Sequence, residues 1–151
     1  MKPFTNPVLA ALDKKFWSVF CALCMALFLC SCTAAMREYY SHEDNFVSAT
    51  GVVIHMVQDE EYHAIYFGFS DLSPKFDDIA FKIVGDNVQI VLENGISEKI
   101  KLGDTVEFVT APRYFGDGYV MPIVAISVDG EQLLDYEEGY ANFMEWLEKE
   151  N

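Results

Sequence analysis

The chain of 151 residues is long enough for about one domain, and its 52% hydrophobic and 15% aromatic composition excludes an intrinsically disordered protein. The formal charge is −14 and unevenly spread: the first 32 residues carry +2, whereas the rest hold 7 basic and 23 acidic residues, a net −16. This acidity excludes a polyanion as the main partner, so we expect no nucleic-acid binding.

The N-terminal segment is predicted to be an export signal. Lys14 and Lys15 precede an apolar run of 17 residues from Phe16 to Cys32. A basic stretch before a short apolar run is typical of secretory signals, and it predicts that the N-terminus stays in the cytoplasm while the remainder is exported. The run reaches 21 residues if residues 33–36 are included. An uncleaved membrane anchor ending near residue 36 is therefore an alternative, and plain secretion is another.

The end of this run, Leu29-Cys30-Ser31-Cys32, resembles the lipobox of bacterial lipoproteins. The resemblance implies a diacylglycerol on the Cys32 thiol and cleavage after Ser31, so that residues 1–31 are the signal peptide. A diacyl group anchors a protein stably to a membrane. We therefore expect the protein on the exported side of a bacterial membrane, with inner and outer membrane both open. No cysteine follows Cys32, which excludes a disulfide within the exported part.

Residues 32–45 are mostly polar and are interpreted as a tether between the anchor and the domain. Tyr39 and Tyr40 interrupt the polar pattern. The alternative interpretation is a first helical turn of the domain itself.

From residue 46 the pattern changes to that of short strands separated by turns rich in Gly, Asn and Asp. Such a pattern predicts an all-β barrel or sandwich. The predicted strands cover residues 46–58, 62–70, 79–84, 88–92, 105–111, 119–128 and 132–134. Turns are predicted at residues 59–61, 71–74, 85–87, 93–95, 103–104, 116–118 and 129–130.

Residues 135–151 are predicted to form an amphipathic helix. Tyr136, Tyr140, Phe143 and Leu147 recur at spacings of four, three and four residues, which places them on one helical face. We expect this face to pack across the barrel. A helix that binds a partner is the alternative.

The strand region resembles the OB-fold, a five-stranded Greek-key barrel. The resemblance rests on Gly51 in the first strand, the aromatic second strand, the Gly-Asp turn within Lys101–Phe108, and the final strand Val120–Val128. It covers about residues 47–134, although no helix is indicated between residues 92 and 105, where many OB domains carry one. The expected fold is mainly β: an OB-like barrel (residues 46–134) with a C-terminal helix, preceded by an N-terminal signal or anchor helix. Exported domains of this type are often non-catalytic binding modules.

Candidate catalytic and metal-binding residues are few. His55 and His63 flank the first hairpin turn and, with Asp59 and Glu61, are the candidates for a metal site of the His and carboxylate type. Their spacing matches no standard motif, so we predict no metal and no cofactor. Phosphate loops, serine elbows and His-Glu-x-x-His motifs are absent from the sequence. We therefore expect no catalytic residues and no enzymatic activity.

A candidate binding surface lies in the loop before the last barrel strand. In OB-folds this loop borders the binding face, and here it contains Arg113, Tyr114, Phe115 and Tyr119. Exposed aromatic residues and arginine favour protein or sugar contacts. In the alternative interpretation, Tyr114 and Phe115 cap the barrel core.

Together these features predict a membrane-anchored lipoprotein that binds a basic or neutral protein or small ligand. One alternative is an immunity-type lipoprotein that neutralises a basic toxin, which the acidic charge would attract. Another is a structural envelope component with an uncleaved transmembrane helix.

Overall fold

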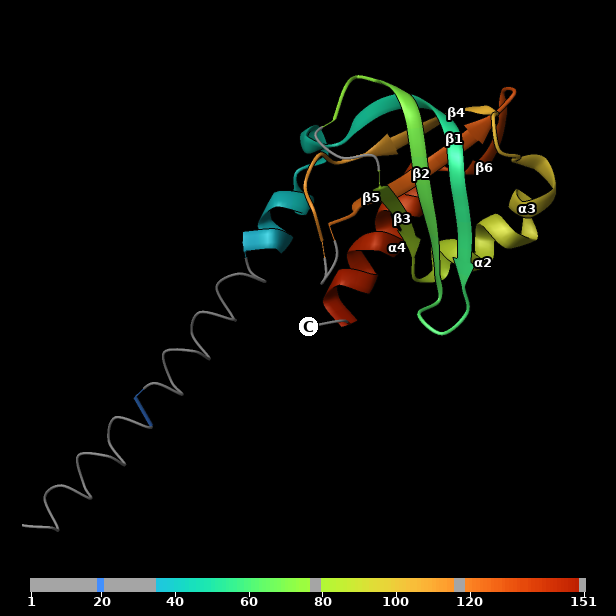
Figure 1. Cartoon of the computed structure of the whole chain (residues 1–151). Helices are drawn as coiled ribbons and strands as arrows, with labels where there is room; N and C mark the ends of the chain where they lie inside the picture. The colour runs from blue at the N-terminus through green and yellow to red at the C-terminus, as the bar shows by residue number, and fades with distance from the viewer. Residues whose placement is uncertain (1–18, 21–34, 77–79, 116–118, 150–151) are drawn as a thin grey trace, which may run out of the picture. The chain divides into compact units, whose positions relative to one another are not determined.

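The computed structural model describes residues 19–20, 35–76, 80–115 and 119–149. Residues 1–36 and 37–151 form two separate units. All the strands of the described residues belong to the second unit (Figure 1).

Six strands and several helices make up the unit. The strands are β1 (Val47–Asp59), β2 (Ala64–Ser73), β3 (Ala80–Val84), β4 (Thr105–Thr110), β5 (Met121–Val128) and β6 (Glu131–Leu134). The helices are η1 (Glu43–Asn45), α2 (Asp86–Glu93), α3 (Ile96–Lys99) and α4 (Tyr136–Lys149). Residues 37–41 are also helical.

Five of the strands close into a β-barrel. The strand order is β3-β2-β1-β4-β5, and a parallel pairing of β3 with β5 closes the ring. All other neighbouring strands are antiparallel, and β6 extends the sheet by pairing with β5. The prediction of a mainly β protein with a barrel is therefore confirmed.

The barrel core is rich in stacked aromatic rings. Phe69 lies at its centre: its ring stacks on Phe108 with centroids 4.6 Å apart and also contacts Phe67 and Phe81. All four side chains are at most 2% exposed. Burial of each such side chain contributes about 1.5–3 kcal/mol, so the second strand's aromatic pattern supplies much of the core.

The predicted strand at residues 88–92 is wrong, because these residues belong to helix α2. Its β-branched residues resemble a strand, but Val88 and Val91 are three positions apart and both are buried on one helical face. Gly95, at φ 77°, follows the helix in the left-handed conformation that commonly ends helices. The same Asn-Gly dipeptide also fits a hairpin turn. Helix α3 lies between residues 92 and 105, where the sequence indicates none.

The predicted turn at residues 71–74 is also wrong in part, since β2 continues to Ser73. Ser73 pairs with Thr50 of β1, and an irregularity between Thr50 and Val52 lets the two strands stay together. A hairpin turn joins β1 and β2 as predicted, but it covers residues 60–63 rather than 59–61. A turn also precedes β4 near the predicted Gly103-Asp104. The loop tip predicted at residues 116–118 lies outside the described residues.

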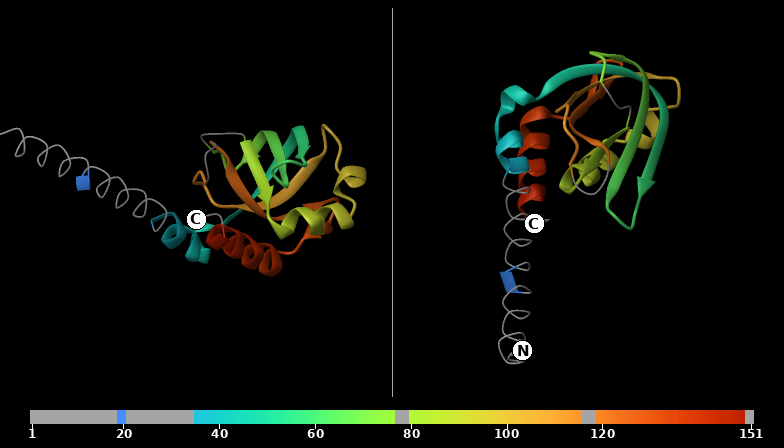
Figure 2. Two further views of the ribbon diagram at one scale, coloured as in Figure 1. Left: turned by 90° about the horizontal axis from the view of Figure 1, so that it is seen from below. Right: turned by 60° about the vertical axis from the view of Figure 1, so that its left-hand side comes forward.

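Helix α4 confirms the predicted C-terminal helix. It lies beside α2 and covers one side of the barrel (Figure 2). Phe143 and Leu147 are at most 3% exposed. Gly139 permits the close approach of α4 to β5, since a Cβ there would collide with the Val124 carbonyl group of β5. The Asn87 side chain of α2 donates a hydrogen bond to the Gly139 carbonyl oxygen at 2.8 Å, which joins the two helices.

The segment interpreted as a tether is described from residue 35, and its residues 37–45 correspond to the alternative helical interpretation. Tyr40 is fully buried and its ring packs edge-on against Phe143. Arg37 Nη2 donates hydrogen bonds to the carbonyl oxygens of Leu147 (3.2 Å) and Glu148 (3.0 Å). These carbonyls are at the end of α4, where helix carbonyls lack internal partners. This segment therefore packs on the barrel unit and caps its last helix.

Candidate functional site

The predicted binding loop divides into a buried and an exposed part. Phe115 is only 2% exposed and packs edge-on against Phe143 and Trp146 of α4. Phe115 therefore belongs to the core, as in the alternative interpretation of this loop. Its prediction as a binding residue is replaced by a packing role. Tyr114 and Tyr119 are 41% and 78% exposed and contact each other edge-on.

Arg113 is engaged within the domain. Its guanidinium lies 4.7 Å from the centre of the Tyr39 ring, a cation–π contact. Its carbonyl oxygen accepts a 2.6 Å hydrogen bond from the Tyr40 hydroxyl. Burial raises the pKa of Tyr40 above its usual range, and the neighbouring Tyr39 raises it further, while Arg113 lowers it. The loop therefore holds residues 39 and 40 in place, which gives Arg113 a structural role.

The two histidines considered for a metal site are separated along the first hairpin. His55 pairs with Gly68, whereas His63 lies in the turn beyond Asp59, which pairs with Ala64. His55 is four residues from Asp59, or roughly 13 Å along the strand. Among the described residues, no three His, Cys, Asp or Glu side chains are grouped to hold a metal ion.

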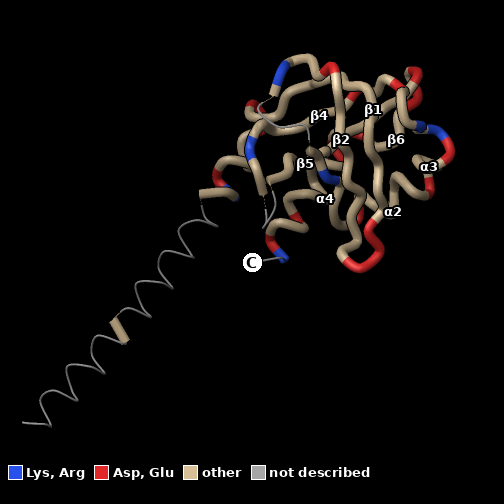
Figure 3. The backbone as a smooth tube through the Cα atoms, in the orientation of Figure 1, with Lys and Arg blue, Asp and Glu red and all other residues tan. Residues whose placement is uncertain are grey.

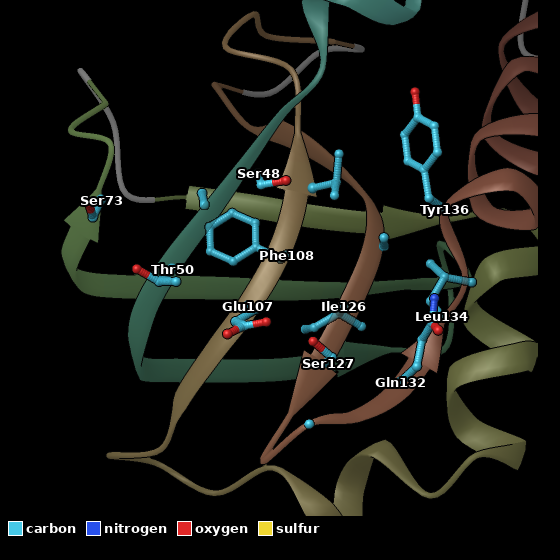
Figure 4. A pocket seen from close by; sticks show the side chains of 14 residues that line it. Ser48, Thr50, Ser73, Glu107, Phe108, Ile126, Ser127, Gln132, Leu134 and Tyr136 are labelled. Atoms are coloured by element: carbon cyan, nitrogen blue, oxygen red, sulfur yellow. The ribbon is translucent and has the colours of Figure 1, made fainter.

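A groove of about 610 Å³ lies over the outer face of the barrel, between β1, β4 and β5 and the β5–β6 hairpin (Figure 4). Tyr136, the first residue of α4, forms part of its wall. Val109 and Ala125, which are on the same face of the sheet as Glu107 and Ser127, also line it, so its surface is both polar and apolar. Mixed surfaces with a few placed polar groups are typical of ligand sites.

A row of polar side chains crosses this groove because their strands are in register. Ser73 pairs with Thr50, Thr50 with Glu107, Glu107 with Ser127, and Ser127 with Gln132. The five residues come from five different strands, β2, β1, β4, β5 and β6. Adjacent strands lie about 4.8 Å apart, so the row spans roughly 19 Å.

Glu107 is at the centre of the row and is the one charged residue among the described residues that line the groove. Its side chain is exposed. Within the described part of the chain, the ion pairs are His42–Glu38, Lys99–Glu131 and Lys149–Glu145, and none of them involves Glu107. No cation of the described residues therefore forms an ion pair with this carboxylate.

Tyr136 at the groove wall interacts with Glu43 of the short helix η1. Desolvation raises the pKa of its hydroxyl, and the Glu43 carboxylate raises it further by charge and by a hydrogen bond. Its ring stacks on Tyr140 with centroids 5.8 Å apart. The wall is thus a fixed aromatic surface, which presents an apolar body and a hydroxyl tip.

The sequence analysis missed the groove residues for a physical reason. Polar residues at alternate strand positions are a normal sign of a solvent-facing side. Only the register between strands places Thr50, Glu107 and Ser127 next to one another. The signal available in the sequence is the single charged residue within the strand Thr105–Thr110.

Acidic residues are spread over the surface of the domain (Figure 3). Three of them, Asp59, Glu60 and Glu61, lie at the β1–β2 turn. The predicted lipid-attachment residue Cys32 lies outside the described residues. Within the described ranges, no helix has the length and apolarity needed to cross a membrane.

Comparisons with known proteins give no relative for this chain. No protein-family model, no curated protein and no solved structure matches it.

Proposed function

We propose that this chain is a membrane-anchored, exported bacterial lipoprotein whose acidic barrel binds a basic or neutral partner without catalysis. The observation that carries the binding part is the groove over β1, β4 and β5, crossed by a polar row centred on Glu107. The groove combines hydrogen-bonding side chains with an aromatic wall, as ligand sites do.

The anchor is supported by the sequence Leu29-Cys30-Ser31-Cys32 after a basic flank and an apolar run. Metabolic labelling with a clickable fatty acid tests it. The wild-type chain should be labelled, Cys32→Ala should lose the label, and Cys30→Ser should keep it. Equal labelling of wild type and Cys32→Ala would remove the anchor from the proposal.

We further propose that the barrel is of the OB type. Three features support this: β1 pairs with both β2 and β4, β3 pairs with β5 in parallel, and helices α2 and α3 lie between β3 and β4. This architecture is used by many binding domains, but function depends on the site rather than on the fold. The proposal of binding therefore rests on the groove.

The binding part is tested by nuclear magnetic resonance with the full chain in detergent micelles. The probes are three decapeptides, one cationic, one neutral and one anionic, and a neutral oligosaccharide. At least one probe should shift the amide signals of β1, β4 and β5 around Thr50, Glu107 and Ser127. If no probe shifts any of these signals at millimolar concentration, the groove is not a binding site.

The net charge of −16 after Cys32 favours a second candidate, an immunity-type lipoprotein. A basic secreted toxin would be attracted to such a domain over long range at low salt. This candidate would be supported if a neighbouring gene encodes a basic secreted protein and if the two purified proteins form a stable complex.

A further inference from the structure

We propose that the groove receives a lysine or arginine side chain of a protein partner and that Glu107 is its acceptor. The inference rests on the proposed binding function and adds the chemical class of the partner.

The charge in the groove favours a cation. Glu107 is the one charged side chain among the described lining residues, and no ion pair within the described chain neutralises it. Val109 and Ala125, on the same face of the sheet as Glu107, keep part of the groove surface apolar. Hydrogen bonds between an ionised donor and a carboxylate are about twice as strong as neutral ones. A cation placed here therefore gains more than a neutral group does.

The neighbouring hydroxyl groups complete the site. Thr50 and Ser127 are the direct cross-strand partners of Glu107 on either side. Each is about 4.8 Å away along the sheet, and no hydrogen bond of either side chain occurs within the described residues. A lysine ammonium has three donors and an arginine guanidinium has five. Either group matches a carboxylate flanked by two hydroxyl oxygens.

The length of the polar row points to a chain segment as the occupant. The row from Ser73 to Gln132 crosses five strands, or roughly 19 Å. An extended segment of about six residues covers that distance. Neighbouring residues of such a segment would meet the remaining hydroxyl and amide groups, and the −16 charge of the domain would favour its approach if it is basic.

The test is fluorescence anisotropy with the full chain in neutral detergent micelles. The probe is a fluorescein-labelled decapeptide of alternating lysine and serine, compared with one of alternating glutamine and serine. Glu107→Gln is compared with Glu60→Gln, a control at the exposed β1–β2 turn that changes the net charge equally. Circular dichroism confirms that both variants are folded.

We expect the lysine peptide to bind and the glutamine peptide to bind at least about tenfold more weakly. Glu107→Gln should weaken lysine-peptide binding at least about tenfold, and Glu60→Gln less than about twofold. Equal weakening by both variants would show attraction by the whole surface and overturn the site. Equal binding of both peptides, unaffected by Glu107→Gln, would overturn the proposal that the groove receives a cation but would leave the groove as a binding site. Absence of binding by the lysine peptide would also overturn the proposal of a cation site. The magnetic resonance experiment with the four probes would then decide separately whether the groove binds any ligand.

Discussion

The substitution Gly139→Ala tests how α4 docks on the barrel. In an isolated helix, alanine is more favourable than glycine by about 1 kcal/mol. Here the new Cβ would collide with the Val124 carbonyl group and would lie 3.0 Å from Leu134 Cγ. The carbonyl belongs to the main chain of β5, between Ile123 and Ala125, which both pair with β4, so it can move away only if the strand itself shifts. Overpacking costs about 1–3 kcal/mol, and we take the upper end because backbone is involved. The expected net loss is therefore about 2 kcal/mol.

Thermal unfolding of residues 37–151, followed by circular dichroism, measures this loss. At about 4 °C per kcal/mol for a unit of this size, Tm should fall by about 8 °C. The control Ala141→Gly lies on the exposed face of α4 and should cost about 0.5–1 kcal/mol by propensity alone. An unchanged or higher Tm for Gly139→Ala would refute the close contact between α4 and β5.

Three further predictions follow from the N-terminal segment and the charge. A fragment of residues 46–151 should be less stable than residues 37–151 by at least about 3 kcal/mol, because it loses the buried Tyr40 ring and the Arg37 hydrogen bonds. Urea unfolding measures this difference, and equal unfolding midpoints of the two fragments would contradict it. Burial raises the pKa of Tyr40, so its contribution to stability is complete below its ordinary pKa of about 10 and is lost as the pH rises above that value. Unfolding measured from pH 9 to 11 should therefore show a steeper loss of stability for wild type than for Tyr40→Phe, and parallel curves would refute the assignment. A labelled single-stranded oligonucleotide should show no anisotropy change at 0.15 M salt, whereas micromolar binding with a steep salt dependence would contradict the charge argument.

The elements that the sequence predicts well are those whose pattern is local. The long strand β1 alternates with a period of two residues, and helix α4 repeats with a period of 3.6 residues. Helix α2 was not predictable in this way. Its residues favour a strand locally, and its helical state depends on burial of Val88 and Val91 and on the contact between Asn87 and α4. Tertiary contacts override local propensity at such positions.

The candidate site shows the same division. An aromatic loop near Arg113 is visible in the sequence, but the burial of Phe115 depends on α4, which is separated from it along the chain by the two strands β5 and β6. The groove requires the registers of four strand pairs at once. A shift of one residue in any pair would turn its side chains to the other face. No single segment therefore carries the signal for Glu107 and its neighbours.

Zero-length crosslinking tests the central claim, binding of a basic segment at Glu107, most directly. A carbodiimide joins a carboxylate to an amine only where the two are in contact, and mass spectrometry then identifies the carboxylate. With the lysine–serine peptide and the full chain in neutral detergent, the account predicts that the main crosslink is to Glu107. Crosslinks spread over Asp59, Glu60 and Glu61 of the β1–β2 turn, with none at Glu107, would contradict it.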